Sequence, residues 1–177
     1  MRLGPLLGFE PSFDTVVTVA REMEAVGAGS VMLAEAGRSA VTQAAAVIAA
    51  TESIEVGTYV VNAFARSPWL TGLTARDLDE MSGGRFVMGV GTGNPHFNSW
   101  YMGIDSSKPL AAMRDFVQIV RQVTAARAGE RVSYDGSVHH VAKWRASFPP
   151  KRDSVPVYLS ASGPNMMRLA AEISDGI

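Results

Sequence analysis

The sequence predicts an α/β protein built on a parallel sheet, and three observations support this prediction. Apolar runs that suit strands alternate with segments of helical spacing, five times along the 177 residues. The strand-like runs are almost continuously apolar, which is typical of strands covered on both faces. The composition, 47% hydrophobic and 19% charged, is that of a soluble protein with a sizeable core. The length predicts a single domain over residues 1–177.

The first two strand-helix units are short and regular. Residues 3–9 predict a strand, and residues 11–26 follow with apolar side chains at a period of about 3.6 residues, which predicts an amphipathic helix. Residues 30–34 suit a buried parallel strand. The alanine-rich residues 39–51 then predict a second helix.

The third and fourth units follow the same pattern. Residues 54–61 are rich in β-branched side chains and predict the third strand. Residues 69–81 carry leucines at helical spacing, and this helix is expected to stop at Gly83 and Gly84. Residues 85–90 predict the fourth strand, and no further helix is expected before about residue 109.

The fifth unit is interrupted by an insertion. Residues 109–126 predict a helix with one apolar face, and residues 155–159 predict a fifth strand that leads into a last helix. Between them, residues 129–152 are expected to form an insertion that carries a hairpin, with its turn at residues 134–137. The end of the insertion, residues 149–152, is expected to be a surface linker.

Repeated strand-helix units imply right-handed crossovers in a parallel sheet, which leaves two architectures. One is an open doubly wound sheet and the other is a barrel. Sequence period alone does not separate the two.

Charge and composition exclude several classes of function. Sixteen Lys and Arg against seventeen Asp and Glu leave a net charge of −1, and the basic residues are scattered, so no nucleic-acid partner is expected. There is no cysteine and there are only three histidines, so we expect no metal site. A redox role must therefore rest on a bound organic cofactor. No segment suits a signal peptide or a membrane span, so we expect no membrane association and a cytoplasmic location.

Two loops that follow predicted strands are candidate binding sites. The first loop follows the fourth strand and consists of Gly91, Thr92, Gly93 and Asn94. It forms either a structural turn or a loop that contacts a cofactor. A nicotinamide fingerprint fails on context, because the cluster follows the fourth strand and no helix is expected directly after it. The second loop follows the fifth strand and suits either an anion site or a plain helix start. Its residues are Ala161, Ser162, Gly163 and Pro164.

Proton handling and histidine chemistry have few candidates. Glu10 after the first strand and Glu35 after the second could act as acids or bases, or could equally be capping or surface carboxylates. His96 lies in the loop after the fourth strand and could face a pocket. His139 and His140 lie in the insertion and are expected to be solvated.

Three segments resemble the luciferase-like monooxygenase superfamily. They are VGTYVVNAFARSP (residues 56–68), LDEMSGGRFVMGVGTG (residues 78–93), and PVYLSASGP (residues 156–164) with AEISDG at residues 171–176. Within the superfamily the chain is most similar to the branch that uses coenzyme F-420, particularly methylenetetrahydromethanopterin reductase-like proteins. The resemblance extends over nearly the whole chain.

The resemblance implies a (β/α)8 barrel, or TIM barrel, in which the carboxyl ends of the strands hold a deazaflavin or a flavin. Such an oxidoreductase passes a hydride between coenzyme F-420 and a small organic substrate, with FMN as the alternative cofactor. In the family, the loop at residues 91–94 contacts the cofactor and the loop at residues 161–164 binds its phosphate. Asn62 falls where relatives place a polar group near the ring. Tyr59 and Val60 fall where relatives have a β-bulge with a nonprolyl cis peptide bond behind the ring.

Two departures from the family pattern shape the remaining expectations. Many F-420-dependent relatives carry Asp-His after the second strand, whereas this chain has Glu35 and Ala36. A complete barrel needs roughly 250 residues, so the sequence is expected to be the N-terminal part of a barrel. The full-length protein is expected to be a homo-oligomer. A noncatalytic half-barrel that binds a partner or a phosphate ligand is the alternative from a different class.

Overall fold

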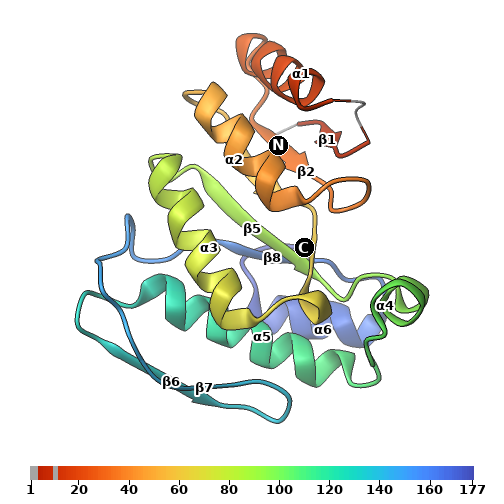
Figure 1. The fold of residues 1–177 in the computed structure, drawn as a ribbon, viewed down its shortest axis with the longest axis vertical. Helices are drawn as coiled ribbons and strands as arrows, with labels where there is room; N and C mark the ends of the chain where they lie inside the picture. Colours follow the sequence, from red (N-terminus) through yellow and green to blue (C-terminus); the bar gives the residue numbers. More distant parts are fainter. Residues whose placement is uncertain (1–3, 10–11) are drawn as a thin grey trace.

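The computed structural model describes residues 4–9 and 12–177, and these form a layered α/β structure (Figure 1). The strands are β1 (Leu6–Leu7), β2 (Ser30–Leu33), β3 (Glu55–Thr58), β4 (Val61–Asn62), β5 (Phe86–Gly91), β6 (Arg131–Asp135), β7 (His140–Arg145) and β8 (Val157–Leu159). The α-helices are α1 (Phe13–Ala25), α2 (Ala40–Ala50), α3 (Pro68–Met81), α4 (Pro95–Met102), α5 (Pro109–Ala125) and α6 (Pro164–Ile173). A short 3-10 helix, η1 (Ala63–Ala65), follows β4.

The main sheet is parallel, as the sequence predicts, and its strands follow chain order, as expected for the barrel that the family resemblance implies. β1 pairs with β2, β2 with β3, and β3 with β5, while β8 pairs with β5 in register Met88 to Val157. The short β4 also pairs with β5, with Asn62 opposite Gly91. Beyond β8, Gly176 forms a parallel bridge with Tyr158.

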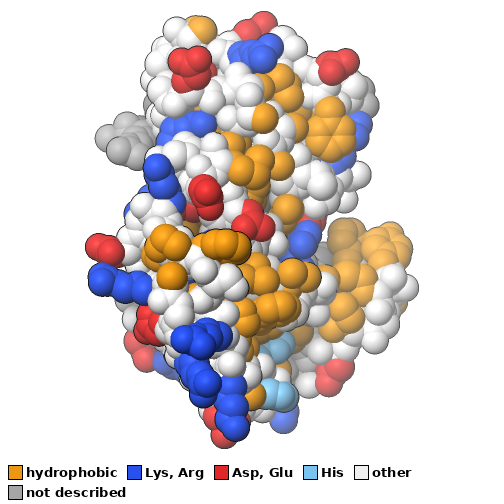
Figure 2. Space-filling model, turned by 60° about the vertical axis from the view of Figure 1, so that its left-hand side comes forward, with side chains coloured by type: hydrophobic (Ala, Val, Ile, Leu, Met, Phe, Trp, Pro, Cys, Tyr) orange, Lys and Arg blue, Asp and Glu red, His pale blue; other side chains and the backbone are white. Residues whose placement is uncertain are grey.

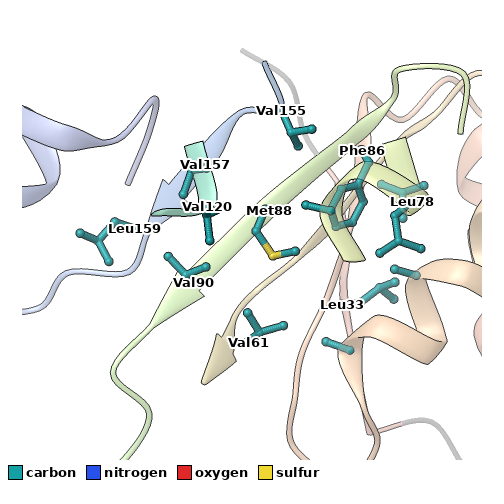
Figure 3. Close-up of a cluster of buried hydrophobic side chains, with 14 of the residues drawn as sticks. Leu33, Val61, Leu78, Phe86, Met88, Val90, Val120, Val155, Val157 and Leu159 are labelled. Atoms are coloured by element: carbon teal, nitrogen blue, oxygen red, sulfur yellow. The ribbon is translucent and has the colours of Figure 1, made fainter. Parts of the chain in front are cut away.

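The core lies between the sheet and the helices that cover it (Figure 3). Every residue of β5 is buried, so this central strand supplies Phe86, Met88 and Val90 to the core. Helix α5 packs its apolar face there, with Met113 and Phe116 fully buried. This burial explains why β5 reads as a continuous apolar run rather than as an alternating one.

The predicted third strand is divided in two. The peptide bond between Tyr59 and Val60 is a nonprolyl cis bond, as predicted from the family resemblance, and it separates β3 from β4. Just before the break, the Thr58 hydroxyl donates to the Gly89 carbonyl at 2.8 Å and accepts from the Gly89 amide at 2.9 Å. A Cβ at Gly89 would lie 1.9 Å from the Thr58 carbonyl oxygen, so only glycine fits there.

The predicted hairpin is present as the antiparallel pair β6 and β7. The Asp115 carboxylate on α5 binds its tip, accepting from the Tyr134 hydroxyl at 3.0 Å and from the Val138 and His139 amides at 2.7 and 3.1 Å. Tyr134 and Asp135 pair with β7, and the Gly136 amide donates to the His139 carbonyl, so the turn lies at residues 136–139, two residues later than the predicted 134–137.

Three further expectations need correction. His139 is half-buried with its ring against Phe116, and burial lowers its pKa, whereas His140 is exposed as expected. Arg152 is not part of a surface linker, because it forms an ion pair with the buried Asp79 and donates to the Phe86 carbonyl. The first strand is shorter than residues 3–9, although Leu3 itself lies outside the described residues.

The prediction that no helix begins before about residue 109 was also wrong, since α4 starts at Pro95. The Asn94 side chain caps it by accepting from the His96 amide at 2.9 Å, and Pro95 occupies the first turn. Helix α4 buries only Asn98, so it has no apolar face toward the core that a helical period could reveal. Among the described residues, no helix is long and apolar enough to span a membrane.

Candidate functional site

A cavity of about 620 Å³ opens at the carboxyl ends of the parallel strands. Three connections and α4 surround it. Ala34 and Glu35 follow β2, while Gly93 and Asn94 follow β5. The remaining lining residues are Tyr59, Val60, Asn62, Ala65, Arg66, Phe97, Tyr101 and Met102. Carboxyl ends of parallel strands are where barrel enzymes place their active sites, so this cavity is the candidate functional site.

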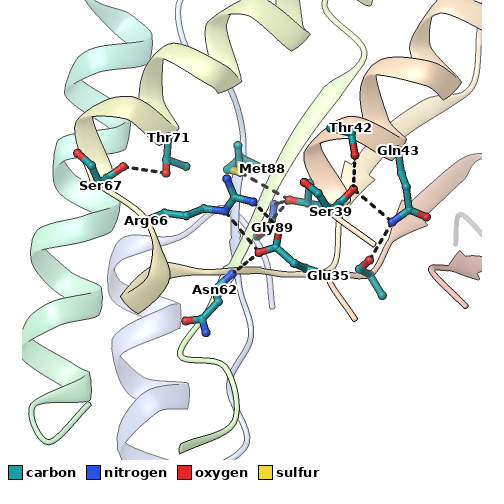
Figure 4. A network of polar contacts seen from close by, with 12 residues as sticks. Glu35, Ser39, Thr42, Gln43, Asn62, Arg66, Ser67, Thr71, Met88 and Gly89 are labelled. Atoms are coloured by element: carbon teal, nitrogen blue, oxygen red, sulfur yellow. Dashed lines mark hydrogen bonds and ion pairs between the residues drawn. The ribbon is translucent and has the colours of Figure 1, made fainter. Parts of the chain in front are cut away.

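Glu35 joins two parts of the cavity wall (Figure 4). One carboxylate oxygen accepts from the Asn62 amide at 3.1 Å and from Arg66 Nε at 3.4 Å, and the other forms a close ion pair with Arg66 Nη2. The side chains are half-buried, with 20% of Glu35 and 30% of Arg66 exposed. Glu35 therefore fixes both ends of the segment from Asn62 to Arg66 against the end of β2.

Asn62 continues this polar connection toward β5. Its Oδ1 accepts from the Phe64 amide at 3.0 Å, and its Nδ2 donates to Asn98 Oδ1 at 2.7 Å. Asn98 in turn donates from Nδ2 to the Thr92 carbonyl at 2.9 Å. Glu35, Asn62, Asn98 and Thr92 thus form a chain of hydrogen bonds that links the loops after β2, β4 and β5.

The glycines after β5 allow these loops to approach one another. Gly93 adopts a φ of 65°, and a Cβ there would lie 2.5 Å from Asn62 Nδ2. A Cβ at Gly91 would lie 2.7 Å from Val60 Cγ2 and 3.2 Å from Ser160 Cβ. Gly91, the last residue of β5, is therefore the point where this strand meets the connection between β3 and β4 and the loop after β8.

The loop after β8 lies beside the cavity rather than in its wall. The Ser160 amide donates to the Val90 carbonyl at 2.9 Å, which joins the loop to the end of β5. Gly163 is the N-cap of α6 and supplies no side-chain cap, so the first amides of α6 are left for another acceptor. Gly91, Thr92 and the four loop residues at 161–164 do not line the cavity.

Sequence reasoning missed several residues of this site. Asn98 is fully buried although its segment was expected to be a loop, and Arg66 had no assigned role before its pairing with Glu35 was visible. The signal that could have identified Asn98 is the Asn94-Pro95 pair, which is typical of a helix start. His96 stacks on Trp100 with ring centroids 4.9 Å apart and does not line the cavity. Glu10 lies outside the described residues.

The chemistry of the lining fits a flat ring system with polar edges. Tyr59, Val60 and Ala65 offer apolar surface, while Asn62, Asn94 and Arg66 offer hydrogen-bonding groups. The cavity volume of about 620 Å³ is in the range of small-molecule sites. The residues present therefore fit a deazaflavin or flavin ring.

Fold and site together define an α/β protein of the barrel type with an open cavity at the carboxyl ends of its strands. The chain belongs to the luciferase-like monooxygenase family, whose sequence profile matches residues 1–177. It is 39% identical, over 72% of its length, to a 5,10-methylenetetrahydromethanopterin reductase of Archaeoglobus fulgidus, of which it covers 36%.

Solved structures support the same fold. The coenzyme F-420-dependent tetrahydromethanopterin reductase of Methanopyrus kandleri superposes with a TM-score of 0.88 at 22% identity, covering 99% of this chain and 54% of that one. An F-420-dependent secondary alcohol dehydrogenase in complex with an F-420–acetone adduct gives a TM-score of 0.86 at 22% identity over 98% of this chain and 56% of that one. The chain therefore has the (β/α)8-barrel type of fold. It spans about half the length of these two solved relatives and 36% of the Archaeoglobus fulgidus reductase.

Proposed function

We propose that the full-length protein is an oxidoreductase that transfers a hydride between coenzyme F-420 and a small organic substrate. The observation that carries this proposal is the convergence of three loops on one cavity, at the ends of β2, β4 and β5. The family membership supports it, and so do the names of relatives that act with this coenzyme.

Coenzyme F-420, when bound, supplies a deazaflavin ring that accepts or donates a hydride. The chain's own residues would hold that ring. Tyr59 and Val60 would contact one face of the ring, and Asn62 and Asn94 would bind its polar edge. Asn98 would hold Asn62 in place, since the Asn62 amide nitrogen donates to it.

The loop after β8 is the proposed site for the phosphate of the cofactor. Ser162 offers a hydroxyl, and the amides at the start of α6 have no side-chain cap. The positive end of the helix dipole adds to the attraction for an anion. Ala161, Gly163 and Pro164 complete this loop, and the space that a Cβ at Gly163 would occupy is open.

We propose that Glu35 positions Asn62 and Arg66 rather than carrying a proton itself. Both of its oxygens are already engaged by a main-chain amide and a guanidinium. A carboxylate held in this way fixes the cavity wall and balances the charge of Arg66. Glu10 stays a candidate for acid-base chemistry.

Binding of the cofactor tests the proposed function directly. The full-length protein is titrated with F-420 and, separately, with FMN, and binding is followed by the change in cofactor fluorescence. Saturable F-420 binding that is lost in Gly93→Val supports the proposal, because a side chain there would collide with Asn62. Binding of FMN but not of F-420 would mean that the cofactor is a flavin rather than a deazaflavin. Binding of neither cofactor by the folded protein would overturn the proposal in favour of a noncatalytic half-barrel.

A further inference from the structure

One short helix carries an unusual amount of exposed apolar surface. In α4, 51% of Phe97, 72% of Trp100, 76% of Tyr101 and 40% of Met102 are exposed. These are neighbours on a helix of eight residues. Figure 2 shows hydrophobic side chains gathered in patches between charged side chains of both signs, and α4 contributes four large exposed apolar side chains within eight residues. Exposed apolar patches on a soluble protein usually mark a binding surface.

Helix α4 has two sides with different surroundings. Phe97, Tyr101 and Met102 line the cavity, and we call these three residues the aromatic wall. The rings of Phe97 and Tyr101 pack together with centroids 5.1 Å apart. Trp100 does not line the cavity and instead packs on His96. It is therefore an aromatic residue of the same helix that can serve as a control for the aromatic wall.

The aromatic wall is held in place although it contributes little to the core. The buried Asn98 ties the middle of α4 to Asn62 and to the Thr92 carbonyl. The Ile104 amide donates to the Asn98 carbonyl at 2.9 Å, and Gly103 ends the helix with a φ of 63°. A helix fixed at both ends and in the middle presents its rings in one arrangement.

The charges around the cavity favour an uncharged ligand. Helix α4 contains no Asp, Glu, Lys or Arg. Across the cavity, Glu35 and Arg66 neutralise one another as an ion pair. An ion entering the site would meet no unbalanced charge from these groups, whereas a flat apolar ring would bury the exposed faces of Phe97 and Tyr101.

We propose that the aromatic wall determines substrate specificity and selects an uncharged substrate with a flat ring. This inference rests on the proposed function, because the substrate ring would lie against α4 while the cofactor lies against Tyr59 and Val60. The wall acts through stacking and exclusion of water, and it takes no part in the chemistry of hydride transfer.

The test uses the full-length protein with F-420 bound and two uncharged probes, 2-naphthol as the flat ring and cyclohexanol as the non-planar one. Calorimetry gives the affinity of each probe for the wild type, Phe97→Ala, Tyr101→Ala and the control Trp100→Ala. We expect 2-naphthol to bind about tenfold more weakly to the two wall variants, as loss of a ring contact implies. We expect unchanged F-420 affinity in all variants, unchanged 2-naphthol affinity in Trp100→Ala, and weaker binding of cyclohexanol than of 2-naphthol to the wild type.

Other results would overturn the inference in recognisable ways. Equal loss of 2-naphthol affinity in Trp100→Ala, or equal affinity of both probes for the wild type, would contradict selection by the wall. A shift from dimer to monomer in size-exclusion chromatography of Tyr101→Ala, with 2-naphthol affinity unchanged, would make α4 an interface between copies. Failure of the wild type to bind F-420 would refute the proposed function itself, which is a separate result. Circular dichroism melts confirm that each variant is folded.

Discussion

Two ion pairs lie at opposite ends of the parallel strands, and they differ in burial. At the amino ends, Arg152 contacts Asp79 at 2.7 Å, and the Asp79 side chain is only 2% exposed. At the carboxyl ends, Glu35 and Arg66 form their pair at the cavity, where 20% and 30% of their side chains are exposed. The same chemistry is thus placed once inside the structure and once at its opening.

The difference separates stability from function. Burial raises the pKa of Asp79, and Arg152 counteracts this by bonding to the carboxylate. The buried Asp79 carboxylate is tolerated only when Arg152 neutralises it, so the pair holds α3 against the segment that precedes β8. The cavity pair costs less to form and to break, and its place is the end of the barrel where catalytic groups lie. We therefore expect the first pair to control folding and the second to control activity.

The largest effect is expected from breaking the buried pair. Arg152→Met leaves the Asp79 carboxylate buried without its cation, and the free energy of unfolding should fall by about 3–5 kcal/mol. Urea denaturation of the full-length protein measures this. The control Arg127→Met removes an exposed pair with 3.9 Å between its charged atoms, and it should have little effect. Equal destabilisation by the two variants would refute the assigned role of burial.

Breaking the cavity pair should have the opposite profile. Glu35→Gln keeps an acceptor for the Asn62 amide but releases Arg66, so kcat/KM should fall by about 100-fold through misplacement of the cavity wall. The free energy of unfolding should change by no more than about 1 kcal/mol, because the pair is partly exposed. Glu35→Asp, which restores the charge, should recover part of the activity, while the exposed Glu52→Gln is the neutral control. A stability loss as large as that of Arg152→Met would end the distinction between the two pairs.

A larger side chain at Gly163 tests whether the loop after β8 serves cofactor binding rather than folding. No atom lies within 4 Å of a Cβ placed at Gly163, and its φ of −117° suits any residue. Gly163→Leu should leave the melting temperature nearly unchanged but weaken F-420 binding by about tenfold, by blocking the anion site at the start of α6. Fluorescence titration gives the affinity. Gly163→Ala is the control, whereas Gly83→Leu is unsuitable because Gly83 has a positive φ. Undiminished affinity of Gly163→Leu would reduce the loop to a plain helix start.

The parts that sequence analysis predicted are those with a local signal. The parallel sheet was predicted from the alternation of apolar runs and helical periods, and β5 illustrates this signal because all of its residues are buried. The chain order of the strands was implied by the family resemblance. The cis bond after Tyr59 came from family resemblance and from no property of the neighbouring residues.

The parts that were missed depend on contacts between distant residues or on surfaces that face no core. Helix α4 escaped detection because its large side chains point to the cavity and to solvent, so no apolar period marks it. Arg152 was assigned to a linker because its partner, Asp79, lies far away in the sequence. The pairing of Glu35 with Arg66 was missed for the same reason.

A carboxylate held by main-chain amides gives the smallest and most specific test of the comparison. At the amino ends of the strands, Glu24 accepts from the amides of Glu52, Ser53 and Ile54 at 2.6–3.2 Å. Partial burial raises the pKa of Glu24, but these hydrogen bonds outweigh it and lower the pKa from 4.5 to about 2. Folding therefore favours the ionised form, and the stabilisation is complete above pH 4.5 and is lost as the pH falls toward 2.

Glu24→Gln should accordingly lower the free energy of unfolding by about 1 kcal/mol at neutral pH, a value reduced by solvent screening at this partly exposed site. Urea denaturation at a series of pH values should show the difference from wild type shrinking below pH 4.5. The exposed Glu22→Gln on the same helix controls for the loss of a charge. A difference that stays constant with pH would mean that Glu24 acts by packing, and charge at the amino ends would then stabilise the fold only where Arg152 neutralises it.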